Sequence, residues 1–168
     1  MAIIFHRYVE KKSRGFVLLV AIIFMSVMLS FALTLGSLSY KQHVLTGAAI
    51  DSQYAFYASD SGLECALYAD QKLNSFEYAT HNSSTPPPLI VCGGATAVRQ
   101  GTLFKDGTVL IDVQRISLDA GKRCADMTVY KYALGPSSIF SQGYSVPCTT
   151  VATPGNARLV SRGVKASY

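Results

Sequence analysis

The most prominent pattern in the chain is an unbroken apolar run near its beginning. Residues 16–40 form 25 consecutive positions without a charged side chain. An α-helix needs about 20 apolar residues to cross the hydrocarbon core of a bilayer, so this run has a membrane-spanning length. Its weakest helical positions are Gly36 and Gly47, since glycine costs about 1 kcal/mol relative to alanine in a helix interior. The pattern predicts one long helix from Phe16 to about Leu73.

Polar residues return in the second part of this predicted helix. Phe56, Leu63 and Leu67 recur at helical spacing with small residues beside them, and acidic side chains occupy other faces. This spacing predicts an amphipathic continuation with one packed side. The helix is expected to end near Asn74, because the three prolines at 86–88 cannot continue it. Three tyrosines of the segment are also expected to cover a sheet: Tyr54, Tyr57 and Tyr68.

Short β-rich runs separated by turn residues follow from Leu89 onward. They lie at 89–92, 101–116, 126–134, 138–146 and 157–168. The Asp106-Gly107 pair favours a hairpin with a type I′ turn, whose two central residues need positive φ. Short turns favour an antiparallel sheet of four or five strands, which needs cover on one face. We therefore predict an α+β fold, in which the long N-terminal α-helix packs its second part on a small antiparallel β-sheet head.

The charge is concentrated before the apolar run. The net charge is +5, and residues 1–15 alone carry four basic residues against one acidic residue. Basic residues beside an apolar run are signals that hold that end in the cytoplasm. The remaining eleven basic and nine acidic residues nearly balance. We therefore predict a single-pass membrane protein with a cytoplasmic N-terminus and an extracytoplasmic head, and no nucleic-acid site.

All four cysteines follow the apolar run, so in this topology they are exported to where disulfides persist. Cys65, Cys92, Cys124 and Cys148 are 27, 32 and 24 residues apart. The absence of a CxxC or a nearby histidine pair argues against a metal site. Three pairings are possible, and we favour Cys65–Cys92 with Cys124–Cys148 because partners near in sequence need the least chain rearrangement. Four free buried thiols are the alternative.

The first 15 residues are polar and basic and end in Lys-Ser-Arg-Gly directly before Phe16. They are typical of a targeting segment rather than of a fold. An ordinary secretory signal has an apolar region of roughly 7–15 residues followed by a small-residue cleavage site. Here the apolar run is longer and leads into more helix, which disfavours cleavage behind it.

The order Lys-Ser-Arg-Gly-Phe followed by an uncharged helix resembles the class III leader of type IV prepilins. The resemblance covers the leader, the long helix and, more loosely, the segment YAFYASDSGLECAL, which is similar to a segment of minor pilins. It implies that a prepilin peptidase cuts between Gly15 and Phe16 and that the new terminal Phe16 is methylated. It also implies three partners besides the membrane: other pilin subunits, the prepilin peptidase and an inner-membrane assembly platform.

One position departs from the pattern of that family. Most pilins carry a glutamate at the fifth position of the processed chain, which pairs with the terminal amine of a neighbouring subunit, and here that position is Val20. A carboxylate in a bilayer is costly unless it is paired, so Val20 removes both a cost and a recognition contact. In the family this absence resembles tip-type minor pilins and pseudopilins. We therefore expect a minor or priming subunit.

Three small hydroxyl residues recur every four positions on one face of the apolar helix: Ser26, Ser30 and Thr34. Small residues allow close helix approach, and their hydroxyls can bond to carbonyls of their own helix. We expect this face to pack against other helices in assembly. The alternative is a lone helix that tolerates small residues.

The sequence offers little for catalysis. The three histidines are scattered, so no Ser/His/Asp arrangement is predicted. Asp60 and Glu64 are spaced i, i+4, and we expect a partner for them in Arg158 or Arg162. We predict no enzyme, no catalytic residue, no metal and no cofactor.

The predicted division of the chain has four parts. They are a basic leader at 1–15, a transmembrane or fibre-core helix at 16–40, an amphipathic continuation at 41–75 and a disulfide-bearing antiparallel β head at 76–168. The resemblance implies a structural subunit of a type IV pilus or type II secretion-like fibre. The first alternative is an unprocessed single-pass anchor that displays a small extracellular binding domain. A membrane-tethered enzyme is the third hypothesis.

Overall fold

A computed structural model describes residues 14–155 and 158–168. The predicted leader therefore lies outside the described residues except at its last two positions. The chain forms two compact units, Met1–Thr46 and Gly47–Tyr168, and the helix α1 (Arg14–Gln71) contributes residues to both. The sequence-based division began the head at residue 76, whereas the second unit also includes the distal part of α1.

The part of α1 in the first unit has no packed side. Every side chain described between residues 15 and 46 is exposed. This helix is long and apolar enough to cross a membrane. At a rise of about 1.5 Å per residue, the 25 uncharged residues span roughly 38 Å, which exceeds the ~30 Å hydrocarbon core of a bilayer.

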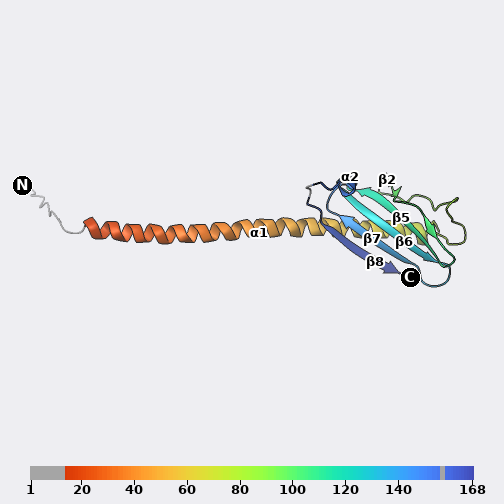
Figure 1. The fold of residues 1–168 in the computed structure, drawn as a ribbon, viewed down its shortest axis with the longest axis horizontal. Helices are drawn as coiled ribbons and strands as arrows, with labels where there is room; N and C mark the ends of the chain where they lie inside the picture. Colours follow the sequence, from red (N-terminus) through yellow and green to blue (C-terminus); the bar gives the residue numbers. More distant parts are fainter. Residues whose placement is uncertain (1–13, 156–157) are drawn as a thin grey trace, which may run out of the picture. The chain divides into compact units, whose positions relative to one another are not determined.

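The head contains one six-stranded antiparallel sheet, which confirms the predicted α+β class. Its long strands lie side by side in the order β5 (Val109–Leu118), β6 (Arg123–Tyr132), β7 (Ser138–Tyr144) and β8 (Ser161–Ser167) (Figure 1). The short strands β3 (Val98–Arg99) and β4 (Phe104–Lys105) both pair with β5. A separate ladder joins β1 (Val91–Cys92) to β2 (Ala95–Thr96), and the short helix α2 (Cys148–Ala152) follows β7.

The predicted hairpin at Asp106 forms between β4 and β5, but the predicted turn type is wrong. Neither Asp106 nor Gly107 has a positive φ, which a type I′ turn requires. Instead the Asp106 carboxylate accepts hydrogen bonds from the backbone N–H groups of Thr108 at 2.7 Å and Val109 at 2.8 Å. These bonds, with Thr108 contributing most, lower the pKa of the Asp106 carboxyl. The side chain thus reinforces a loop that the Asp106 N–H also closes by donating to the Val109 carbonyl at 3.1 Å.

The distal part of α1 packs on the sheet (Figure 1), and small residues form its packed face. The distance between helix and sheet is short: a Cβ on Gly143 of β7 would lie 2.2 Å from the Ala55 oxygen and 2.2 Å from the Ser59 nitrogen. A Cβ on Gly62 would lie 2.7 Å from the Ser141 Oγ. Only a stripe of small side chains permits this approach. The buried members of the stripe are Ala55, Ala58, Ser59, Gly62, Ala66 and Ala69.

The larger residues of this part of α1 lie only in part where predicted, since Leu63 and Leu67 are partly buried against the core but other large residues are not. Phe56, expected on the packed side, is 47% exposed. The three tyrosines expected to cover the sheet are also exposed: Tyr54, Tyr57 and Tyr68. The helix also ends at Gln71 rather than near Asn74, which adopts a left-handed φ of 50°. The packed face therefore combines the predicted Leu63 and Leu67 with a stripe of small residues, which the close backbone approach requires.

Two disulfides fasten the head. Cys65 on α1 is bonded to Cys92 on β1, with Cα atoms 6.0 Å apart, and Cys124 on β6 is bonded to Cys148 on α2, with Cα atoms 4.8 Å apart. These are the two pairs that the sequence favoured. Each closes a loop of moderate length, for which restriction of the unfolded chain stabilises a fold by about 3 kcal/mol.

Candidate functional site

The apolar segment at 16–40 is the largest chemically distinctive surface of the first unit. Apart from small hydroxyl residues its side chains are apolar, and all those described are exposed, so no described residue of the chain shields them. A helix that is apolar on every side is stable only in lipid or among other apolar helices. What this segment offers chemically is therefore insertion and packing rather than catalysis.

The predicted processing position lies at the start of this segment. Gly15 is the second residue of α1, and no atom lies within 4 Å of where its Cβ would be, apart from its own helix and chain neighbours. Phe16 is 72% exposed and Val20 is 48% exposed. The residues that precede Arg14 lie outside the described residues. Cleavage and methylation at Gly15 and Phe16 remain predictions.

The hydroxyl groups of the predicted packing face are bonded to the helix itself. Ser26 Oγ donates to the Ile23 carbonyl at 2.8 Å, and Ser30 Oγ donates to the Val27 carbonyl at 2.8 Å. Thr34 Oγ1 lies 2.9 Å from the Phe31 carbonyl oxygen. Because these hydroxyls find partners in their own helix, the face can enter an apolar environment without leaving them unsatisfied.

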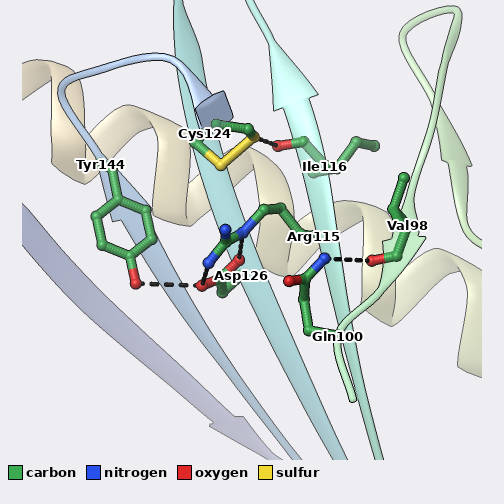
Figure 2. The surroundings of a disulfide bond; sticks show 8 residues. Val98, Gln100, Arg115, Ile116, Cys124, Asp126 and Tyr144 are labelled. Atoms are coloured by element: carbon green, nitrogen blue, oxygen red, sulfur yellow. Dashed lines mark hydrogen bonds and ion pairs between the residues drawn. A yellow bond between two sulfur atoms is a disulfide. The ribbon is translucent and has the colours of Figure 1, made fainter. Parts of the chain in front are cut away.

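A charged cluster lies on the face of the sheet that points away from α1. Figure 2 shows Arg115, Asp126 and Tyr144, from β5, β6 and β7, pointing toward one another near the Cys124 disulfide. The Arg115 guanidinium donates two bonds to the Asp126 carboxylate, at 2.7 and 2.8 Å, and the Tyr144 hydroxyl donates at 3.2 Å. The bonds to Asp126 raise the pKa of Arg115, and burial followed by the Asp126 charge raises the pKa of Tyr144. The bidentate Arg115–Asp126 pair joins β5 to β6, and the Tyr144 hydrogen bond adds β7.

A second cluster fastens the end of α1 to the sheet. Lys131 of β6 donates to the buried Asp70 carboxylate at 2.7 and 3.0 Å, and the Tyr168 hydroxyl donates to the same carboxylate. Burial, and then the hydrogen bond to Asp70, raise the pKa of Tyr168. Sequence reasoning missed this cluster, because Asp70 and Lys131 are 61 residues apart. The one available indication was Lys131 itself, a cation on a strand of the sheet that was expected to pack against the helix.

A third polar cluster holds the proline-rich segment that follows α1. The buried Asp112 carboxylate accepts from Arg99 at 2.6 Å, and Arg99 also donates to the Pro87 carbonyl at 2.6 Å. The Gln114 side chain accepts from the Ile90 N–H at 2.8 Å. Each of these contacts is satisfied within the head, so the cluster explains how the segment is held rather than suggesting a ligand.

The expected pairing of helix carboxylates with C-terminal arginines is wrong. Arg162 donates from its Nε to the Ser52 hydroxyl at 2.7 Å, and neither Asp60 nor Glu64 forms an ion pair with a described residue. Among the described residues no three His, Cys, Asp or Glu side chains gather as a metal site would require.

No protein-family model, curated protein or solved structure matches the chain. The architecture itself, a long N-terminal helix and an antiparallel sheet, is compatible with a pilin-like layout.

Proposed function

We propose that this chain is a structural subunit of a type IV pilus or a type II secretion-like fibre, stored in the membrane before assembly. The observation that carries the proposal is the apolar helix at 16–40, whose described side chains are all exposed, together with a disulfide-fastened head. Such a helix needs either lipid or neighbouring helices around it, and a fibre subunit uses both in turn.

The leader supports processing before assembly. Basic residues before Gly15 hold the junction on the cytoplasmic side, and the uncharged run begins at Phe16. A prepilin peptidase cuts between these two residues, and the terminal Phe16 is then methylated. Removal of the leader takes away most of the charge that keeps the helix in its membrane orientation.

Packing between helices follows from the small face of the segment. Ser26, Ser30 and Thr34 permit close approach while their hydroxyls stay bonded to their own helix. In the fibre this face lies against the helices of other pilin subunits. An inner-membrane assembly platform delivers the subunit to that position.

The absence of a carboxylate at Val20 supports a minor, tip or priming role. A subunit without that group lacks the contact that recruits it behind a preceding subunit. Replacing Val20 by Glu is expected to raise the number of copies per fibre, whereas a Val17→Glu control is not. The minor role fails if the unaltered chain is already the abundant shaft subunit.

The second candidate function is an unprocessed single-pass anchor that displays the head outside the cell. It shares the exposed apolar helix and the topology, and it differs in keeping residues 1–15. The head then acts as a binding domain, with no fibre.

The mature N-terminus decides between the two candidates. Mass spectrometry of the chain from sheared surface fibres is expected to find methylated Phe16 as the first residue. A Gly15→Leu variant is expected to keep the leader, whereas Gly36→Ala, a control at another open glycine of α1, is expected to be processed normally. Recovery of the unaltered chain with Met1 intact, in the membrane and absent from fibres, supports the anchor instead.

A further inference from the structure

The face of the sheet that points away from α1 carries apolar side chains beside the Arg115–Asp126 cluster. In-register neighbours across antiparallel strands share a face, and Ser141 and Gly143 mark the side that contacts α1. Positions that alternate with them on β5, β6 and β7 therefore point outward. Antiparallel sheets commonly carry polar residues on such a face. Here the outward residues include Val109, Ile111, Val113, Tyr130, Tyr132 and Phe140.

A groove lies at one end of this face, formed by two adjoining hollows of about 300 and 330 Å³. Both hollows are lined by Tyr132, Ser138 and Lys165. We call this surface the outer-face groove, and its principal residues are Tyr130, Tyr132, Ser138, Phe140, Lys165 and Ser167. Each hollow has the size of a small-ligand site.

The strand register explains why the groove is hollow. Ser138 of β7 lies between Tyr130 of β6 and Ser167 of β8 in one cross-strand row. Two small serines in a row flanked by rings leave a depression. In the next row Phe140 lies beside Lys165, and its ring leans over Gly163, where a Cβ would come within 2.7 Å of it.

Lys165 is the chemically decisive residue of the groove. It forms no hydrogen bond or ion pair within the described part of the chain, whereas Lys131 is bonded to Asp70 and Lys105 donates to two carbonyl oxygens. Its ammonium offers up to three donors beside the exposed Tyr132 and the half-buried Tyr130. An unpaired cation among rings and hydroxyls fits a ligand with one negative charge, apolar surface and several hydroxyl groups.

We propose that the outer-face groove binds an acidic saccharide, a short sugar chain that carries one carboxylate. The C–H faces of a sugar ring pack on the rings of Tyr130 and Tyr132, its hydroxyls exchange hydrogen bonds with Ser138 and Ser167, and its carboxylate pairs with Lys165. The proposal concerns the head alone and does not depend on whether the chain is processed or assembled.

A second copy of the chain fits the groove less well. Protein interfaces bury about 800 Å² on each partner and are depleted in lysine at their centres. No acidic residue among those lining the two hollows answers Lys165. A polyanion also fits less well, because residues 47–168 carry ten basic and nine acidic residues and the groove contains one free cation.

Calorimetry on the full chain in detergent micelles tests the proposal with two probes that differ in a single carboxylate, cellobiouronic acid and the neutral cellobiose. The unaltered chain is expected to bind the acidic probe more tightly. Lys165→Gln is expected to weaken binding of the acidic probe at least tenfold and to leave binding of the neutral probe unchanged. Tyr132→Ala is expected to weaken binding of both probes.

Two exposed residues outside the groove provide matched controls, and thermal melting checks that each variant is folded. Lys122→Gln and Tyr57→Ala are expected to bind both probes as the unaltered chain does. The proposal is overturned if neither probe binds at millimolar concentration, or if Lys122→Gln weakens binding as much as Lys165→Gln. It is also overturned if the chain binds neither probe and self-associates in sedimentation in a way that Tyr132→Ala abolishes.

Discussion

The two parts of α1 are one helix with opposite relations between size, polarity and burial. In residues 16–40 the side chains are mostly large and apolar, and all those described are exposed. In the part that belongs to the head, small residues such as Ala55, Ser59 and Ala66 are fully buried, whereas Phe56 is exposed. Burial in this protein therefore follows the presence of a partner surface and not the hydrophobicity of the side chain.

The comparison also shows how two kinds of apolar surface are used. The sheet approaches the head part of α1 so closely that backbone atoms of the helix meet Gly143. Close approach gains dispersion contacts along the whole helix but allows no bulky side chain between the layers. The first part has no such partner within the chain, and its large side chains remain available for lipid or other helices.

The largest effect is expected from adding one methyl group at the helix–sheet contact. Gly143→Ala places a Cβ within 2.2 Å of backbone atoms of Ala55 and Ser59, which cannot move aside as a flexible side chain could. Overpacking of this kind is expected to lower the free energy of unfolding of the head by about 3 kcal/mol or more. Urea denaturation of the full chain in detergent, followed by near-UV circular dichroism, measures the change.

Gly47→Ala is the matched control, because the same methyl group meets nothing within 4 Å there. In a helix interior, alanine is favoured over glycine by about 1 kcal/mol, so this variant is expected to be as stable as the unaltered chain or slightly more stable. Equal losses in the two variants would contradict the close-contact explanation.

The next largest effect is expected at the cluster that fastens the end of α1. Lys131→Met leaves the Asp70 carboxylate, whose side chain is 1% exposed, without its cation. Removing one partner of such a buried pair is expected to cost about 3 kcal/mol. The unfolding free energy at neutral pH, again from urea denaturation, gives the value.

Arg115→Met tests the same chemistry at a more accessible pair. The Arg115 and Asp126 side chains are 18% and 16% exposed, so water can compensate part of the loss. We expect a decrease of about 1 kcal/mol. A larger loss for Arg115→Met than for Lys131→Met would reverse the assigned importance of the two clusters.

A smaller effect is expected from pH, through Tyr168. Its pKa is raised in the folded head by burial and by the bond to Asp70, so the unfolded chain loses the hydroxyl proton first as pH rises. Stability from this group is therefore fully present below about pH 10, the usual tyrosine pKa, and is lost as the pH rises above it. Urea denaturation between pH 8 and 11 is expected to show a decline that is shallower in Tyr168→Phe. An identical slope in both proteins would exclude Tyr168 as its cause.

The smallest effect on the head is expected from changes in the first part of α1. Ser30→Leu replaces an exposed small residue, so we expect the free energy of unfolding of the head to change by less than about 0.5 kcal/mol. Association between helices in detergent, measured by chemical crosslinking, is expected to fall because leucine blocks close approach. Ala32→Leu serves as the control, because it adds bulk at an exposed small residue on the opposite side of the helix. A destabilised head would show that this residue supports the head after all.

Much of the fold could be predicted from local patterns. The uncharged run at 16–40 predicts helix by its length, and the alternation along residues 109–118 predicts a strand with one buried face. Cysteine proximity also favoured the two pairs that the structure contains. These features depend on residues close together in sequence, where spacing and geometry are directly related.

The candidate sites were less predictable because they depend on strand register. The outer-face groove joins Tyr132 to Lys165 across three strands, and spacing alone does not reveal that two serines lie between rings. The ion pair predicted for Asp60 and Glu64 was wrong for a related reason. The rotation of the helix about its axis, relative to the sheet, decides which helix carboxylate meets a cation.

The sequence by itself determined the apolar helix, the antiparallel β-rich character of the head and the position of the cysteines, because each follows from the periodicity and composition of a short segment. Only the tertiary structure decided which face of α1 is buried, that Asp70 meets Lys131, and that a hollow opens beside Lys165. The hollow depends on strand register. The buried face of α1 depends on how closely the backbones of the helix and the sheet approach. Here that distance is set by small residues on both surfaces, such as Gly62 and Gly143, acting together.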